Sequence, residues 1–220
     1  MTDIIKINKA WNEIYISGKQ FNEYPYDFVV SATKKYIKNT NKKNVLDLGC
    51  GAGNHISFFL NSEFKLITGI DSSKIITDFL DKKYKKNKKV EIINNDISKM
   101  VYRKNFYGLV LDRMSITHNN KDEIKQTIDK VYNSLKKNGY FFSVCFSDNH
   151  NEYTNKKKIN NQQYFNNLVK GTGITSSFLN YNDVKIFYKK FEKVSITEDI
   201  SFNHQTNKKT AIWSLILKKK

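Results

Sequence analysis

The chain has 220 residues, a length that fits one domain with some additional elements. Hydrophobic residues make up 39% of it and charged residues 27%, which is typical of a globular protein and excludes the disordered and fibrous classes. No apolar run approaches the roughly 18 residues of a membrane-spanning helix, and the start of the chain lacks the apolar stretch of a signal peptide. The sequence therefore predicts a protein without a membrane span that works in the cytoplasm.

The formal net charge of +17 ordinarily points to nucleic acid, because Lys and Arg neutralise phosphates. Only Arg103 and Arg113 among the 38 basic residues are arginine, however, and the fork that grips phosphates and reads bases belongs to arginine. Asparagine is also abundant, and a joint excess of Lys and Asn is what AT-rich coding would produce. We therefore expect no specific nucleic-acid partner and a modest attraction for anionic small molecules. The lysines of residues 82–89 are expected to be solvated surface.

Hydrophobic periodicity predicts two amphipathic helices in the first forty residues. From Asn44 onward, short apolar runs alternate with helical stretches. Strands are predicted at 45–48, 66–70, 90–93, 109–111, 140–146, 193–198 and 211–217, and helices at 56–60, 75–80, 124–135 and from Asn182. Gly139 is expected to end the third of these helices. This alternation predicts an α/β fold, with a mostly parallel sheet and helices on both faces. The last two strands can close as an antiparallel pair.

A glycine-rich segment, Asp47-Leu-Gly-Cys-Gly-Ala-Gly53, follows the first predicted strand and precedes a helix. Glycines there let the chain turn tightly and let a ligand lie against the backbone at the carboxyl end of a strand. A nicotinamide dehydrogenase would need a third glycine at the position of Asn54. Asp47 also disfavours a pyrophosphate and suits a cationic ligand.

Three further acids end the next predicted strands. Asp71 lies 18 residues after Gly53, where its carboxylate can accept hydrogen bonds from both hydroxyls of a ribose. Asp96 follows the third strand and can accept from an adenine amino group, and Asp112 ends the fourth strand. Asp71 and Asp96 can alternatively cap helices at strand-to-helix turns.

The glycine turn and these acids, in this order, resemble the class I S-adenosylmethionine-dependent methyltransferases over about residues 44–146. The resemblance implies a Rossmann-like, seven-stranded, mostly parallel sheet with an antiparallel last strand. It implies a single domain over residues 1–220, with a helical cap at 1–43, a cofactor-binding core at 44–146 and an acceptor-side segment at 147–220. It implies S-adenosylmethionine as the cofactor, S-adenosylhomocysteine as its product, and no metal.

The same resemblance implies a set of cofactor-binding residues. Asp47 would hold the methionine amino group, Asp71 the ribose, and Asp96 with Ile97 the adenine. The remaining residues implied to line the cofactor are Gly49, Cys50, Gly51, Asn54, Ser72 and Asp112. The two cysteines, Cys50 and Cys145, are otherwise expected to be small buried thiols.

A narrower resemblance is to bacterial methyltransferases of surface-polysaccharide, or capsule, biosynthesis, in which an N-terminal helix covers the cofactor. It is carried by Trp11, Tyr15, Tyr24-Pro25, Asn54-His55, the segment Asp112-Arg-Met-Ser-Ile-Thr-His118, Gly171-Thr172-Gly173 and Phe178. It implies that Trp11 and Tyr15 contact the cofactor from a helical lid. The alternative is that both residues face the core of the protein.

The acceptor is expected to be a small molecule. The chain has a single proline, Pro25, so it lacks both the (N/D)-P-P-Y segment of enzymes that methylate base amino groups and the Pro-Cys of cytosine-5 enzymes. No appended RNA-binding module is visible.

His118 lies just beyond the fourth strand and is the candidate general base, because its ordinary pKa is near neutral. Arg113 is the candidate clamp for an anionic acceptor. The alternatives are a solvent-facing or capping His118 and an Arg113 held in a structural ion pair. Three residues of later segments, His150, Tyr153 and His204, are possible roof residues of the acceptor pocket.

The sequence therefore predicts an O-methyltransferase acting on a sugar or a phosphate- or phosphoramidate-bearing precursor. The alternatives are an RNA or protein methyltransferase, or a non-catalytic cofactor-binding subunit. The oligomeric state is left open.

Overall fold

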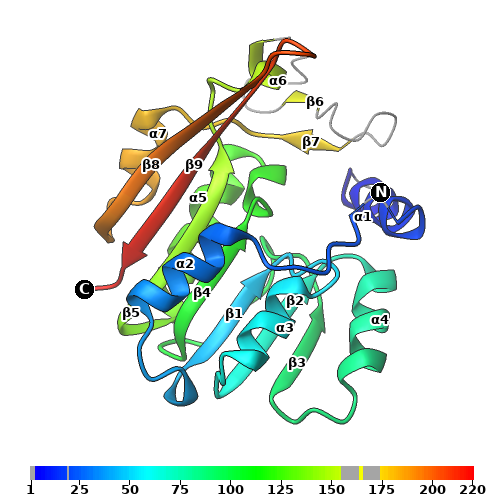
Figure 1. The fold of residues 1–220 in the computed structure, drawn as a ribbon, viewed down its shortest axis with the longest axis vertical. Helices are drawn as coiled ribbons and strands as arrows, with labels where there is room; N and C mark the ends of the chain where they lie inside the picture. Colours follow the sequence, from blue (N-terminus) through cyan, green and yellow to red (C-terminus); the bar gives the residue numbers. More distant parts are fainter. Residues whose placement is uncertain (1–2, 19, 155–163, 166–173) are drawn as a thin grey trace.

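The computed structural model of the protein describes residues 3–18, 20–154, 164–165 and 174–220. Its centre is a seven-stranded sheet with the order β3-β2-β1-β4-β5-β9-β8 (Figure 1). The strands are β1 Asn44–Leu48, β2 Leu66–Asp71, β3 Val90–Asn94, β4 Tyr107–Arg113, β5 Leu135–Phe146, β8 Glu192–Asn203 and β9 Lys208–Lys218. The first five strands pair in parallel, and β9 pairs antiparallel with both β5 and β8. The predicted sheet, including its antiparallel last strand, is confirmed.

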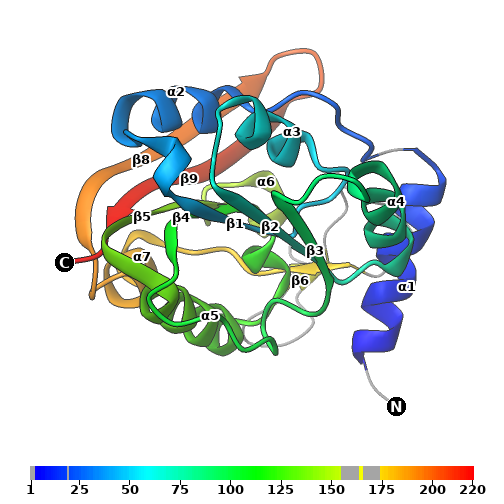
Figure 2. The same cartoon turned by 90° about the horizontal axis from the view of Figure 1, so that it is seen from below.

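Helices cover both faces of this sheet, as Figure 2 shows. The helices of the described residues are α1 Asp3–Ile16, α2 Asp27–Tyr36, α3 Asn54–Asn61, α4 Lys74–Tyr84, α5 Lys121–Ser134, α6 Asn151–Thr154 and α7 Tyr181–Phe187, of which α2, α3 and α4 lie on one face and α5 and α7 on the other. The shorter elements are the 3-10 turns η1 Thr40–Lys42 and η2 Ile116–His118, and the strands β6 Tyr164–Phe165 and β7 Thr175–Ser176, which pair with each other. None of the helices that the structure describes is both long and apolar enough to cross a membrane.

Two apolar cores lie on opposite faces of the sheet. Side chains of α2, α3 and α4 pack against one face with Val45 and Leu109, whereas side chains of α5 and α7 pack against the other with Leu46 and Val110. Successive strand residues therefore alternate between two buried faces. Because both faces are buried, these strands read as continuous apolar runs in the sequence.

The prediction that Gly139 ends a helix is wrong. Helix α5 ends at Ser134, and Gly139 lies within β5. The preceding residue, Asn138, also lies within β5 and has a positive φ of 61°, a conformation that asparagine tolerates better than most residues. A Cβ on Gly139 would lie 2.9 Å from the Lys136 carbonyl oxygen. The glycine therefore permits a close backbone approach rather than a helix end.

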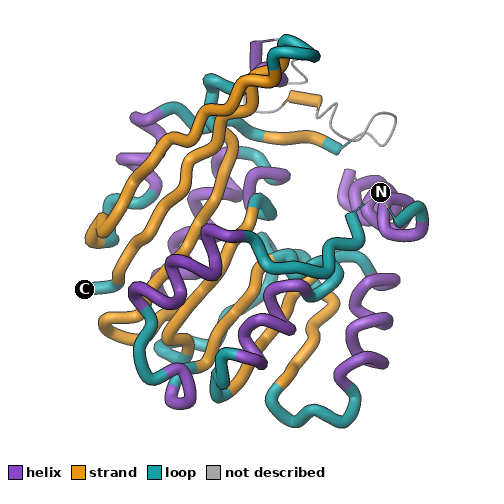
Figure 3. The backbone as a smooth tube through the Cα atoms, viewed as in Figure 1, coloured by secondary structure: helices purple, strands orange, loops and turns teal. Residues whose placement is uncertain are grey.

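Helix α1 lies beside α4 at the end of the sheet where β1 and β2 finish (Figures 1 and 3). The Ser73 hydroxyl donates a 2.6 Å hydrogen bond to Asn12 Oδ1, and Ala10 and Ile14 pack with Ile174. The N-terminal helix is thus held over the carboxyl ends of the strands from two sides. The segment Gly171-Thr172-Gly173, singled out in the sequence, lies outside the described residues.

Candidate active site

The glycine-rich segment forms the turn from β1 into α3. Gly49, Gly51 and Gly53 all have positive φ angles, 63°, 50° and 79°, in the region that glycine adopts without steric cost. A Cβ on Gly49 would lie 2.1 Å from Ser115 Oγ, and one on Gly51 would lie 3.1 Å from the Tyr15 hydroxyl. The turn therefore accepts close contact with the loop after β4 on one side and with α1 on the other.

Asp47 is buried at the start of this turn, with 1% of its surface exposed. Its Oδ2 atom has no hydrogen-bond partner among the described residues, and it lies 3.7 Å from Nδ1 of His55. A buried carboxylate oxygen without a partner is costly. This oxygen therefore fits a ligand that brings a positively charged donor, as the ammonium group of S-adenosylmethionine does.

Asp71 lies at the end of β2, next to the glycine turn. Its carboxylate accepts hydrogen bonds from the backbone N–H groups of Gly51, at 3.0 Å, and Ser73, at 2.9 Å. Burial raises the pKa of Asp71 to about 6. The side chain that caps α4 is Ser73, so Asp71 is not the capping residue of that helix. Burial, followed by the nearby Asp71 carboxylate, raises the pKa of the Tyr15 hydroxyl, which agrees with α1 lying close over this site.

The expected adenine-binding residues follow β3. Asp96 Oδ1 accepts hydrogen bonds from the backbone N–H and the hydroxyl of Ser98, both at 2.8 Å. Ile97 is buried, and Ser72, the residue after Asp71, is half-buried. These residues stand at the ends of two adjacent parallel strands, β2 and β3, at the same edge of the sheet as the glycine turn.

Two other residues expected to line the cofactor, Asn54 and Cys50, lie in or next to the glycine turn. The Asn54 side-chain amide donates a 2.9 Å hydrogen bond to the Tyr24 carbonyl, which fastens the segment between α1 and α2 to the glycine turn. Cys50 is buried, and burial raises the pKa of its thiol well above the ordinary value. The thiol is therefore protonated at neutral pH and is not a nucleophile.

Asp112 supports the loop after β4. Its Oδ1 accepts from the backbone N–H groups of Ser115, at 2.9 Å, and Ile116, at 3.0 Å, and its Oδ2 accepts from the Ser143 hydroxyl at 3.2 Å. Both oxygens therefore have protein partners, and the loop they organise carries His118. A direct contact of Asp112 with the cofactor stays a prediction.

Complete burial raises the pKa of Asp112 to about 7, from about 3.9 in an unfolded chain. The folded state then binds the proton more tightly than the unfolded state. Protonation of Asp112 therefore raises the free energy of unfolding, and this contribution is fully present below about pH 4 and is lost as the pH rises through about 7. Asp112→Asn mimics the protonated acid, because its amide can donate to Ser143. We expect this variant to match the wild type at pH 4 and to be more stable by about 1–3 kcal/mol at pH 8.

Urea unfolding at the two pH values measures this difference. Asp78→Asn, which changes an exposed carboxylate of α4, is the matched control and should leave the pH dependence of the wild type unaltered. If the free energy of unfolding at pH 8 is higher for the wild type than for Asp112→Asn, the raised pKa of Asp112 is contradicted.

His118 is half-buried, and neighbouring residues hold its ring. Its Nδ1 lies 3.1 Å from the Thr175 carbonyl oxygen and 3.2 Å from Ser176 Oγ, and its ring stands edge-on to Trp11 with centroids 5.1 Å apart. A carbonyl oxygen only accepts, so the bond to Thr175 places the hydrogen on Nδ1 and leaves the lone pair on Nε2. Burial lowers the pKa of His118 below its ordinary value of 6.5. The imidazole is therefore neutral, and basic at Nε2, near pH 7.

Arg113 ends β4 with its guanidinium carbon 4.0 Å from the centre of the Tyr26 ring. Among the described residues no carboxylate lies within ion-pair distance of it. Burial lowers its pKa below the ordinary value. The guanidinium is therefore held by a cation–π contact, and the alternative of a structural ion pair finds no acid partner in the part of the chain that is described.

The histidines of later segments differ in their surroundings. His150 is buried and packs against Phe146 and Phe178, and the Tyr153 ring also packs on Phe178. His204 is exposed in the turn between β8 and β9. The sequence did not indicate Tyr26, whose ring lies close to both Arg113 and His55. No spacing or motif distinguishes it from the neighbouring tyrosine.

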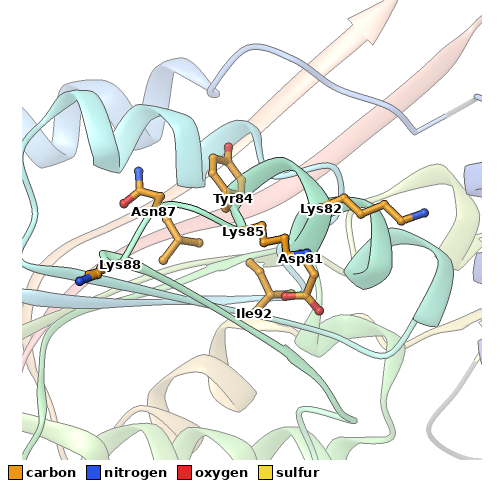
Figure 4. Close-up of a pocket in the computed structure, with 8 residues that line it drawn as sticks. Asp81, Lys82, Tyr84, Lys85, Asn87, Lys88 and Ile92 are labelled. Atoms are coloured by element: carbon orange, nitrogen blue, oxygen red, sulfur yellow. The ribbon is translucent and has the colours of Figure 1, made fainter.

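A cavity of about 510 Å³ lies elsewhere, between α4 and β3 (Figure 4). It is lined by Asp81, Lys82, Tyr84, Lys85, Asn87, Lys88, Val90 and Ile92. Helix α4 ends, and β3 begins, on either side of it. This groove is therefore at the opposite end of the sheet from the glycine turn.

Comparisons with known proteins agree with this geometry. Residues 45–139 match a sequence model described as a methyltransferase domain, and a search of curated proteins found no match. Among solved structures, the chain is similar to a SAM-dependent methyltransferase from Anabaena variabilis, with 15% identity, a TM-score of 0.70, and 100% of this chain and 96% of that one covered. It is also similar to a SAM-dependent methyltransferase from Methanosarcina mazei, with 16% identity, a TM-score of 0.68, and 89% and 98% covered.

A third similar structure is the 1,6-didemethyltoxoflavin-N1-methyltransferase of Burkholderia thailandensis, solved with 1,6-didemethyltoxoflavin and S-adenosylhomocysteine bound. Identity is 14% and the TM-score is 0.70, and 98% of this chain and 88% of that one are covered. At these identities the solved structures establish the fold, and the match over residues 45–139 adds the family of the segment that holds the glycine turn. Residues 45–139 therefore match a methyltransferase domain, and the whole chain has the fold of the SAM-dependent methyltransferases to which it is similar.

Proposed function

We propose that this methyltransferase acts on the oxygen of a small-molecule acceptor, with His118 as the general base. The observation that carries the proposal is the state of His118, a half-buried neutral imidazole whose Nδ1 donates to the Thr175 carbonyl and whose Nε2 keeps a lone pair. S-adenosylmethionine supplies a methyl group activated by its sulfonium. The protein must hold the acceptor in line with that methyl and remove the hydroxyl proton as the new bond forms.

The proposed cofactor contacts lie at the ends of three adjacent strands. Asp47 binds the ammonium group, Asp71 accepts from the ribose hydroxyls, and Asp96 accepts from the adenine. The remaining residues proposed to line the cofactor come from the glycine-rich turn and from the segments after β2 and β3. They are Gly49, Cys50, Gly51, Asn54, Ser72 and Ile97. Trp11 and Tyr15 cover the site from α1, and the contact of Tyr15 with the space above Gly51 supports this placement.

His118 and Arg113 have different proposed roles toward the acceptor. His118 takes the hydroxyl proton at Nε2, and Arg113 attracts an anionic group of the acceptor. The absence of a carboxylate partner for Arg113 among the described residues supports an anionic acceptor, because a half-buried cation gains most from an incoming anion. The acceptor class that fits the two residues is a sugar or a phosphate- or phosphoramidate-bearing precursor of a capsule or other surface polysaccharide. Such molecules carry hydroxyl groups and, when phosphorylated, an anionic group. The solved structure with a bound small molecule supports, at the level of the fold, a small-molecule acceptor in general.

The test is methyl incorporation from radiolabelled S-adenosylmethionine into four sets of acceptors: free sugars, sugar phosphates with nucleotide sugars, total RNA, and denatured protein. We expect incorporation into a hydroxyl-bearing small molecule, with anionic acceptors preferred. Incorporation into RNA or protein alone would replace this function by the alternative acceptor class. A chain that binds S-adenosylhomocysteine but methylates none of the four sets, alone or with added partner proteins, would contradict the proposal.

A further inference from the structure

Helix α1 reaches His118 by two routes. Directly, the Trp11 ring meets the His118 ring edge-on, with centroids 5.1 Å apart and 71° between the two planes. Indirectly, Trp11 packs against an apolar cluster that includes Ile174, and the carbonyl oxygen of the next residue, Thr175, lies 3.1 Å from His118 Nδ1. The position of the imidazole therefore depends on α1 as well as on the loop after β4.

The same indole also neighbours the residue that covers the glycine turn. The centroids of the Trp11 and Tyr15 rings are 6.1 Å apart, and the Tyr15 hydroxyl lies 3.1 Å from where a Cβ on Gly51 would stand. Trp11 is half-buried, so its ring is not a part of the closed core. A row of three rings, Tyr15, Trp11 and His118, thus connects the glycine turn with the loop after β4.

The surroundings of the His118 ring carry no charge. Among the described residues its ring contacts are with Trp11 and with Phe146, at 5.1 and 6.4 Å, and neither side chain titrates. The partners of Nδ1 are the Thr175 carbonyl and the Ser176 hydroxyl. Water stabilises an imidazolium, so rings that displace water favour the neutral imidazole.

The lowered pKa of His118 agrees with these contacts. Burial is its largest cause, and the hydrogen bond to the Thr175 carbonyl acts in the opposite direction. No charged side chain of the described residues contributes to the shift. The protonation state of this imidazole is therefore controlled by how much water reaches the ring, and Trp11 is one of the two rings that keep water away.

We propose that Trp11 is a positioning residue for His118: its indole holds the imidazole in place and keeps water from it, so that Nε2 stays free to take the acceptor proton. The inference rests on the proposed role of His118 as the general base. It gives Trp11 a part in the transfer step in addition to its place over the cofactor. Because His118 is only half-buried, removal of the indole would open the ring to water.

The titration of His118 tests the proposal without an acceptor. NMR of the protein with isotope-labelled histidine follows its four histidines as the pH changes, and the signal missing in His118→Asn is that of His118. The variants are Trp11→Ala, which removes the ring, and Trp11→Phe, which keeps one. Ile16→Ala is the matched control, because it shortens a side chain of the same helix that is 71% exposed.

We expect Trp11→Ala to raise the pKa of His118 toward its ordinary value of 6.5, since water then stabilises the imidazolium. Trp11→Phe should titrate close to the wild type, and Ile16→Ala should match it. The signal of His150, which packs on Phe146 and has no printed contact with α1, should titrate alike in every variant. Trp11→Gln is the second variant and gives the same comparison if the alanine variant does not fold.

The rate of methyl transfer gives the second readout, with the acceptor set that is active in the incorporation test. In Trp11→Ala the acidic limb of the pH–rate profile should move to higher pH by the same amount as the NMR titration. Its kcat near neutral pH should fall about 10-fold, a part of the contribution of a positioned base, and Trp11→Phe should recover most of the loss.

A His118 titration that is the same in the wild type and in the variants without a ring would overturn the inference while leaving His118 as the proposed base. An equal shift in Trp11→Phe and Trp11→Ala would also overturn it, because a ring at this position would then have no effect. Full activity of His118→Asn would instead overturn the proposed base itself, and with it the role of Trp11.

Discussion

Replacing His118 by asparagine is expected to slow methyl transfer about 10²–10⁴-fold, the contribution of a positioned general base. Asparagine can still donate to the Thr175 carbonyl that holds Nδ1, but it has no basic nitrogen. Burial lowers the pKa of His118, so the wild-type rate should fall only as the pH drops below the ordinary histidine range, where Nε2 becomes protonated. That acidic limb of the pH–rate profile should vanish in the variant.

The cofactor affinity should barely change in His118→Asn, because the proposed contacts to the cofactor come from other residues. His204→Asn is the matched control, since His204 is exposed in the turn between β8 and β9, and it should keep the full rate. If the methylated atom is already anionic, no base is needed, and the variant will raise the acceptor KM while keeping most of kcat. A variant with full kcat and an unmoved KM excludes His118 from the site.

Asp71→Ala is expected to weaken the binding of S-adenosylhomocysteine by about 1.5–3 kcal/mol, the scale of hydrogen bonds to a charged group. The same change also removes the acceptor of the Gly51 and Ser73 backbone N–H groups. We therefore expect a loss of stability of about 1–2 kcal/mol even without cofactor. Calorimetric titration and urea unfolding measure the two effects separately.

The pKa of about 6 for Asp71 adds a pH dependence to this binding. Only the ionised carboxylate accepts from both ribose hydroxyls, so the affinity should weaken as the pH falls through about 6, and this dependence should be lost in Asp71→Ala. Asp78→Ala, an exposed carboxylate of α4, is the control and should bind as the wild type does. If Asp71→Ala binds S-adenosylhomocysteine as tightly as the wild type does, Asp71 does not bind the cofactor and only stabilises the turn at Gly51.

The sheet was predictable from the sequence because its strands are buried on both faces. The short, mostly apolar runs of β1 and β2, bounded by polar loops, leave few alternatives. The antiparallel pair of β8 and β9 follows from the short polar turn between them. The end of α5 was not predictable in the same way. A lone glycine is ambiguous between a helix end and a strand position with a close backbone neighbour, and at Gly139 the second applies.

The candidate site was predictable only in part, for a physical reason. Strand-end acids are found by their place in the chain, since parallel strands bring their carboxyl ends to one edge. The hydrogen-bond partners of each carboxylate, which determine its role, come from residues far away in the sequence. Nothing in the sequence indicates that Asp112 accepts a hydrogen bond from Ser143, or that the Tyr26 ring lies close to both Arg113 and His55.

A crystal structure of the complex with S-adenosylhomocysteine tests the central claim, the place of the cofactor, most directly. We expect the amino-acid end at Asp47, the ribose hydroxyls on the Asp71 carboxylate and the adenine beside Ile97, with the sulfur on the side of His118. Density for the ligand away from the glycine turn, for example in the lysine-lined groove between α4 and β3 (Figure 4), would contradict it.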